Sequence, residues 1–151
     1  MNKRESCLVI IKKGDDGIVF IKKLTGLGAG LINFPGGKVE SNETPEECAM
    51  REVREEIGIR LDNLENIAKI FFVLDDGSEE IMYVFLSSSF SGELRGSREA
   101  EPIILKDPPY DKMWPCDRVW LPLVLEGFKV ECKFFFSKDW SEYNGGYCLL
   151  K

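Results

Sequence analysis

Hydrophobic residues along the chain fall mainly into short apolar runs separated by glycine and polar turn residues, a pattern typical of strands. The runs at 7–13 and 17–23 flank a turn at 14–16, which predicts a β-hairpin. Residues 24–37 hold five glycines and one proline, so we predict a loop there with a short strand near 31–34. Further strands are predicted at 67–74, 81–87, 129–137 and, at a sheet edge, 146–150.

One segment has helical character, and its ends are marked in the sequence. Thr44 is placed to cap the helix, with Pro45 in the first helical position and Glu47 as the return partner of a capping box. Gly58 stands where a left-handed residue ends a helix. These signals predict a helix between Thr44 and Gly58.

The C-terminal half mixes helix and turn signals. Residues 114–127 predict a helix interrupted near Pro122, and the polar segment 91–102 is predicted to form turns. Strands before and after the helices predict a layered domain of the α/β or α+β class. A length of 151 residues fits one domain, residues 1–151, with a substantial core.

Net charge and hydropathy restrict the classes of partner that this domain can bind. The chain has 20 basic and 26 acidic residues, a net charge of −6, which argues against a broad basic surface for nucleic acid. No apolar segment approaches the roughly 20 residues needed to cross a bilayer, and no signal peptide is recognised at the start. A small anionic substrate remains compatible if cations neutralise it locally.

Cysteine and histidine usage restricts the chemistry further. The five cysteines are scattered and form no C-x-x-C pair, so reduced thiols in a cytoplasmic protein are expected. The chain has no histidine, which argues against a zinc site and excludes histidine-based triads. Any general base must therefore be a carboxylate, lysine, tyrosine or thiolate.

The predicted helix carries a crowded acidic face. Helical spacing puts an apolar group on one side, Ala49, Met50, Val53 and Ile57. Glu52, Glu55 and Glu56 fall together on an adjoining face, where like charges repel by a few tenths of a kcal/mol per pair. One interpretation is a solvated face compensated by arginines; the other is a platform for divalent metal ions.

The loop before the helix favours the metal platform. Gly36 and Gly37 allow the backbone to approach a ligand closely, and Lys38 is placed to meet a phosphate oxygen. Clustered carboxylate oxygens suit Mg²⁺ or Mn²⁺.

Residues 37–59 resemble the Nudix box. Gly37, Glu43 and the run Arg51-Glu52-Val53-Arg54-Glu55-Glu56-Ile57-Gly58-Ile59 occupy its defined positions. The resemblance implies a mixed β-sheet sandwiched between helices. It also implies hydrolysis of a nucleoside diphosphate linked to another group, by attack of water at phosphorus.

The same resemblance implies roles for individual residues. Glu52, Glu55 and Glu56 match the metal-binding acids, with the Gly36 carbonyl as a further ligand. Arg51 and Glu43 match the pair that orients the catalytic carboxylates. A further metal-binding glutamate outside the box aligns with Glu99, although Glu101 is an alternative and an exposed charged loop is the simpler interpretation.

Beyond the box, residues 22–39 and 111–136 are similar to the MutT-related hydrolases of oxidised purine nucleotides. This similarity implies that Asn33 reads the purine edge, that Trp114 and Phe72 form the walls of the base pocket, and that Asp117 belongs to a base-reading acidic pair. Lys23 is implied to face the triphosphate or sugar. Each residue has a structural alternative: a turn for Asn33, core packing for the aromatics, a helix first turn for Asp117, and the open surface for Lys23.

Two departures from that pattern bear on the substrate. Cys116 stands where the similar enzymes have another aspartate, and Leu27 where they have an aromatic residue. A thiol is a weaker hydrogen-bond partner than a carboxyl group. The resemblance therefore implies a purine nucleoside triphosphate as substrate, in particular an oxidised one such as 8-oxo-dGTP, while these departures argue against a strict preference for 8-oxoguanine.

The expected reaction converts such a triphosphate to the monophosphate and pyrophosphate with Mg²⁺, in a monomeric enzyme. The alternatives are hydrolysis of ADP-ribose, a nucleotide-sugar or a dinucleoside polyphosphate, and a Nudix-fold binding module without turnover. A binding module is expected to have lost catalytic acids, whereas Glu52, Glu55 and Glu56 are all present.

Overall fold

A computed structural model describes residues 3–151. The first half contains β1 (Lys3–Lys13), a 3₁₀ turn (Gly14–Asp16), β2 (Gly17–Lys23), β3 (Ile32–Asn33), β4 (Gly36–Lys38), α1 (Pro45–Ile57), β5 (Arg60–Leu61) and β6 (Glu65–Leu74). The second half contains β7 (Glu79–Ser87), β8 (Phe90–Ser91), β9 (Ala100–Leu105), a 3₁₀ turn (Tyr110–Lys112), α2 (Asp117–Leu125), β10 (Val130–Phe136) and β11 (Tyr143–Leu150).

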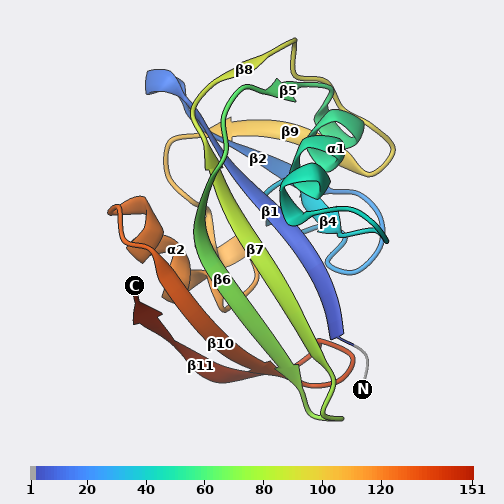
Figure 1. The fold of residues 1–151 in the computed structure, drawn as a ribbon, viewed down its shortest axis with the longest axis vertical. Helices are drawn as coiled ribbons and strands as arrows, with labels where there is room; N and C mark the ends of the chain where they lie inside the picture. Colours follow the sequence, from blue (N-terminus) through green and yellow to red (C-terminus); the bar gives the residue numbers. More distant parts are fainter. Residues whose placement is uncertain (1–2) are drawn as a thin grey trace.

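A nine-stranded mixed sheet forms the centre of the molecule (Figure 1). Its main order is β11-β10-β6-β7-β1-β2-β3, with β4 paired to β1 and β9 paired to β2. The β1–β7 and β6–β10 pairs are parallel, and the other pairs of this sheet are antiparallel. A separate two-stranded sheet joins β5 to β8. The predicted hairpin of β1 and β2 and the predicted edge strand β11 are confirmed.

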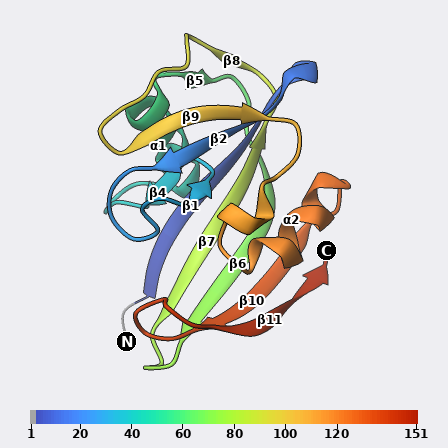
Figure 2. The same ribbon diagram turned by 180° about the vertical axis from the view of Figure 1, so that it is seen from behind.

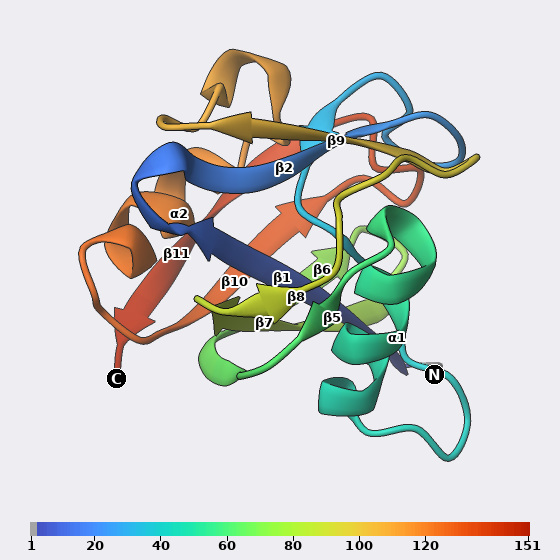
Figure 3. The ribbon, with the colours of Figure 1, turned by 90° about the horizontal axis from the view of Figure 1, so that it is seen from above.

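The two helices lie on opposite faces of the sheet (Figures 2 and 3). Alternation along β1 sends Leu8 and Ile10 into the cluster beneath α2, and Val9 and Ile11 into the cluster beneath α1. Each cluster is continuous and contains fully buried side chains. The predicted mixed sheet between helices is therefore confirmed.

The ends of α1 form as the sequence predicts. Thr44 Oγ1 accepts a hydrogen bond from the Glu47 amide at 3.1 Å, and the Glu47 carboxylate accepts one from the Thr44 amide at 2.9 Å. Gly58 is left-handed at φ 75°, and its amide donates to the Arg54 carbonyl at 3.0 Å. Both ends are determined by contacts within one or two turns.

Two local predictions are wrong. The segment predicted as turns, 91–102, includes the start of β9, where Pro102 lies opposite Ile21 of β2. A proline can occupy an outer strand because its missing amide can face away from the partner. The predicted interruption near Pro122 is also absent, since α2 continues through it to Leu125. Pro122 removes only one amide donor from α2, and the helix packs on the sheet, so its last turn stays helical.

The expectation of reduced thiols is wrong for one pair of cysteines. Cys132 and Cys148 lie directly opposite each other on β10 and β11 and form a disulfide. Cys7, Cys48 and Cys116 are free and buried. The scattered positions in the sequence gave no sign of a pairing that only the strand register creates. None of the helices within residues 3–151 is long and apolar enough to cross a membrane.

Candidate active site

The second half of α1 brings its glutamates against the glycine turn at β4. Glu56 is buried, and its Oε1 accepts a hydrogen bond from the Gly36 amide at 2.8 Å. The Glu52 carboxyl group packs so closely on Gly37 that a Cβ atom at that position would collide with it. Gly37 is therefore required for contact with Glu52 rather than for backbone conformation.

Arg51 organises the acidic groups around it. Its Nε and Nη2 donate to the two carboxylate oxygens of Glu43 at 2.7 and 3.0 Å, which is a bidentate pair. Its Nη1 donates to Glu52 at 2.8 Å and to Glu55 at 3.3 Å, and Nη2 also reaches the Lys38 carbonyl at 3.0 Å. The Arg51–Glu43 pair implied by the sequence is present, and it ties the helix to the preceding loop.

Burial and the contacts with Arg51 shift the pKa values of these acids in opposite directions. It raises the pKa of Glu56 to about 8 and that of Glu52 to about 7, and the nearby negative charge of Glu99 adds to both shifts. Hydrogen bonds from Arg51 lower the pKa of Glu43 to about 2. One acid thus stays ionised at neutral pH as the anchor of Arg51, while two buried acids remain close to their titration point.

The donor set fits a hard divalent cation. Carboxylate oxygens and a nearby backbone carbonyl are the ligands that Mg²⁺ and Mn²⁺ prefer. A cation would also favour the ionised form of the two acids that burial penalises. Within residues 3–151, however, no three acidic, cysteine or histidine side chains already converge on one point. Glu52 and Glu55 turn toward Arg51, and Glu56 turns toward Gly36.

Glu99 lies near this acidic group from a distant part of the chain. Its carbonyl accepts a hydrogen bond from the Leu24 amide at 2.9 Å, which places it at the end of β2. Its charge acts on both Glu52 and Glu56. This proximity fits the choice of Glu99 over Glu101 in the sequence, while the role of Glu99 as a metal ligand stays a prediction.

A cavity of about 130 Å³ opens beneath α2, on the other face of the sheet. Five of the seven residues predicted to bind substrate line it, namely Lys23, Asn33, Phe72, Trp114 and Asp117, whereas Gly37 lies against Glu52 on the other side. Lys38 does not line this cavity; it is exposed at the end of β4, and only its carbonyl joins the Arg51 network. Leu27 stands at the rim, half exposed.

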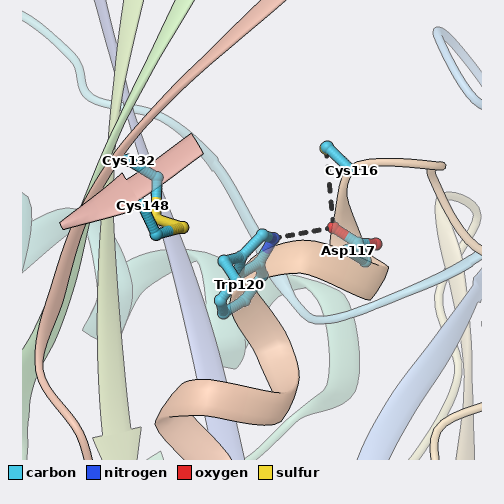
Figure 4. The surroundings of a disulfide bond; sticks show 5 residues. All are labelled: Cys116, Asp117, Trp120, Cys132 and Cys148. Carbon is cyan, nitrogen blue, oxygen red and sulfur yellow. Dashed lines mark hydrogen bonds between the residues drawn. A yellow bond between two sulfur atoms is a disulfide. The ribbon is translucent and has the colours of Figure 1, made fainter. Parts of the chain in front are cut away.

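Asp117 contributes a buried carboxyl group to the lining of the cavity. Its Oδ1 accepts a hydrogen bond from Trp120 Nε1 at 2.9 Å (Figure 4), and the Cys116 thiol lies 3.9 Å from the same oxygen. Its Oδ2 is buried and, among the described residues, has no hydrogen-bond partner. Burial raises the pKa of Asp117 to about 7. Asp117 is also the first residue of α2, so its helix role and its cavity position coexist.

Aromatic rings form one wall of the cavity. Trp140 packs against Phe72 and Trp114, with ring centroids 5.3 and 6.1 Å apart. Phe72 is nearly fully buried, whereas Trp114 is partly exposed. Asn33 uses its Oδ1 to accept the Phe34 amide at 2.8 Å, as a turn residue would, while still lining the cavity.

The sequence analysis missed five residues that line this cavity, namely Leu8, Glu80, Met82, Phe136 and Trp140. Trp140 adopts a left-handed backbone at φ 66°, which is uncommon for a bulky residue. It lies in the connection between β10 and β11, where no periodic pattern marks it. Glu80 is the second residue of β7 and cannot be told from an ordinary surface acid unless the strand register is known.

A mixed sheet between two helices, with Glu52 and Glu56 of one helix held against a glycine turn and Glu55 bound to Arg51, is the arrangement of a class of hydrolases that act on phosphorus-containing anhydrides. A family model described as the NUDIX domain matches residues 2–123, and the chain belongs to this family. It is thus a Nudix pyrophosphohydrolase.

Similar proteins agree with this assignment. The oxidized purine nucleoside triphosphate hydrolase of Danio rerio is 36% identical over 123 residues, which cover 79% of this chain and 78% of the relative. The Mus musculus protein of the same name is 35% identical over 136 residues, covering 87% and 85%. The crystal structure of a MutT protein from Bacillus halodurans has a TM-score of 0.81 at 23% identity, covering 96% of this chain and 97% of that one, and supports the fold.

Proposed function

We propose that this protein hydrolyses a purine nucleoside triphosphate, preferably an oxidised one, to the monophosphate and pyrophosphate with Mg²⁺. The observation that carries the proposal is the buried Oδ2 of Asp117, which has no hydrogen-bond partner among the described residues and lies in a cavity with an aromatic wall. Such an atom costs stability unless a ligand satisfies it. A planar base with hydrogen-bond donors meets that requirement.

The cavity and the acidic site are joined through two strands. Lys23 lines the cavity, and its positive charge also acts on Glu56. Leu8 lines the cavity too, and it pairs in the sheet with Gly36, whose amide binds Glu56. A base held in the cavity therefore leaves its phosphate chain directed along Lys23 toward the glutamates.

Each group has a defined task in this proposal. Trp114 and Trp140 contact the faces or edge of the base, while Asn33 and Asp117 provide the polar contacts that orient it. Lys23 attracts the phosphates. Glu43 holds Arg51, which in turn binds the Glu52 and Glu55 carboxylates while no cation occupies the site. Burial raises the pKa of Glu52 and of Glu56 toward neutrality, and a bound cation would return both groups to the carboxylate form.

The residues that would hold Mg²⁺, or Mn²⁺ in its place, are Glu52, Glu55, Glu56, Glu99 and Gly36 through its carbonyl. When bound, Mg²⁺ neutralises phosphate charge and makes phosphorus easier to attack. The side chains of Glu52 and Glu55 would first have to turn away from Arg51. The relatives from Danio rerio and Mus musculus are named for oxidised purine nucleoside triphosphates, which supports this substrate class.

The test is pyrophosphate release with Mg²⁺ across a panel of nucleotides: dGTP, 8-oxo-dGTP, 2-hydroxy-dATP, dCTP, ADP-ribose and a diadenosine polyphosphate. We expect kcat/KM for one oxidised purine triphosphate to exceed that for dCTP and dGTP by about tenfold or more, because polar groups in a buried pocket discriminate strongly. A flat profile, or a preference for ADP-ribose, would retain Nudix chemistry and reject this substrate.

A further inference from the structure

One wall of the cavity contains a carboxyl group with no part in the proposed reaction. Glu80 lies on β7, in register with Phe72 on β6 and Arg4 on β1. Paired residues share a face of the sheet, so Glu80 and Phe72 point to the same side. Glu80 lines the cavity beside the apolar side chains of Leu8, Met82 and Phe136.

The surroundings of Glu80 provide little compensation for a partly buried acid. Ser6 Oγ donates to its Oε2 at a long 3.4 Å. Among residues 4–151 the structure gives Glu80 no ion pair within 4.0 Å, although Arg4, Lys23 and Lys38 act on it at longer range. Partial burial raises the pKa of this carboxyl. An apolar side chain would suit this wall better, because an acid that is partly removed from water and poorly paired is costly.

We propose that Glu80 is a specificity-determining residue that accepts a hydrogen bond from an N–H group of the bound base. This inference rests on the proposed function, because it places the base in the same cavity. Asp117 Oδ2 and Glu80 are then two acceptors that face one ligand. Together they select a purine that carries N–H donors on two of its edges.

The chemistry of purines makes this selection meaningful. In unmodified guanine and adenine the N7 atom is an acceptor, which a carboxylate repels. Oxidation at C8 to the lactam form places a hydrogen on N7 and turns this edge into a donor. An exocyclic amino group offers a donor on another edge. A pocket with two acceptors therefore favours bases that have both.

The test is the binding of free nucleosides, followed by the tryptophan fluorescence of Trp114 and Trp140. The three probes are 8-oxo-deoxyguanosine, deoxyguanosine and deoxyinosine. The first pair differs by the N7 hydrogen and the C8 oxygen, and the second by the 2-amino group. Free nucleosides need neither Mg²⁺ nor turnover, so the result does not depend on the phosphate chemistry.

Two variants of Glu80 are compared with the parent. In E80M we expect at least one of the two affinity ratios to shrink by about 10- to 100-fold, the value of a hydrogen bond to a charged group. E80Q, which keeps one acceptor oxygen and the same shape, is expected to lie between E80M and the parent. E79M is the matched control, because Glu79 is the next residue along β7 and does not line this cavity.

The outcomes separate the two proposals. If E80M and E80Q keep both ratios while binding remains saturable, Glu80 does not read the base and this inference is wrong. A uniform loss for all three nucleosides contradicts it too, since that result indicates a general packing effect. If the parent binds nucleosides with ratios that depend on Glu80 but releases no pyrophosphate from triphosphates, the inference holds and the proposed function fails.

Discussion

At the scale of single residues, this protein uses burial to prepare acids for different tasks. Glu52 and Glu56 are close to their titration points because they are buried beside each other on α1. Glu43, on the preceding loop, is kept ionised by Arg51. The crowded carboxylates that look unfavourable in the sequence are therefore distributed among separate partners: an arginine, a backbone amide and a prospective cation.

Glu56→Gln tests the role of the most buried of these acids. We expect folding to be nearly unchanged, because glutamine can still accept the Gly36 amide and resembles the protonated acid. We expect kcat to fall about 100-fold or more, because a neutral amide can neither take up a proton nor bind a divalent cation as a carboxylate does. Thermal unfolding and pyrophosphate release measure the two effects. Glu46→Gln, an exposed acid on the same helix, is the control, and equal activity in both variants would disprove the role of Glu56.

Asp117→Asn tests the cost of the buried acid in the cavity. Burial raises the pKa of Asp117 from 3.8 to about 7, so the folded protein binds more protons than the unfolded chain between these values. The contribution of this acid to stability is therefore lost as pH rises from about 4 to about 7. We expect D117N to become more stable relative to the parent over this range, by up to about 4 kcal/mol.

The measurement for Asp117 is urea unfolding at pH 4.5, 6 and 7.5 for both proteins. The other buried acids are present in both, so their contributions cancel in the difference. Asp107→Asn, at an exposed position, is expected to show no such trend. A constant difference between D117N and the parent across this pH range would mean that Asp117 titrates normally.

At the scale of elements, the contact of β4 with α1 positions the acids. Gly36 and Gly37 are neighbours with different constraints. A Cβ at Gly36 would collide with the backbone carbonyl of Cys7, whereas at Gly37 it would collide only with the flexible end of Glu52. The two glycines therefore separate a requirement for folding from a requirement for the site.

Substitution by alanine at each of these glycines makes the distinction measurable. We expect G36A to lower the free energy of unfolding by about 1–3 kcal/mol, because β4 must move away from β1. We expect G37A to fold with less than about 1 kcal/mol of loss, yet to reduce kcat at least tenfold by displacing Glu52. Urea unfolding and pyrophosphate release are the measurements. Full activity in G37A would contradict the placement of Glu52 against the turn.

Elements with local signals were predictable from the sequence, and those set by distant contacts were not. The limits of α1 follow from Thr44, Glu47 and Gly58, which bind within the helix ends themselves. β9 was missed because its pairing with β2 joins residues about eighty positions apart, and Pro102 hid it further. Asn33 and Asp117 were found in the cavity through family resemblance, but Glu80 needed the register of β7 against β6.

At the scale of the molecule, β1 connects the two halves of the site. On one side it pairs with β4 and so fixes the glycine turn against α1. On the other face it contributes Leu8 to the cavity beneath α2. The parallel register of β1 with β7 then sets where Glu80 lies. A slip of one residue would exchange the two faces, so the sheet register determines the distance between base and phosphate sites.

A disulfide between β10 and β11 links two neighbouring strands of this sheet covalently. Cys132 and Cys148 are 16 residues apart in sequence, and Figure 4 shows the disulfide facing the same space as Trp120. Closing a loop of that length stabilises a protein by about 3 kcal/mol, through the entropy of the unfolded chain. We expect C148S, and the parent after reduction, to lose approximately this amount in urea unfolding. C132S/C148S should match the reduced parent and should not respond to reductant.

Thiol titration in denaturant checks the pairing directly. The unreduced parent should show three reactive thiols, Cys7, Cys48 and Cys116, whereas five would show that β10 and β11 are held by backbone pairing alone.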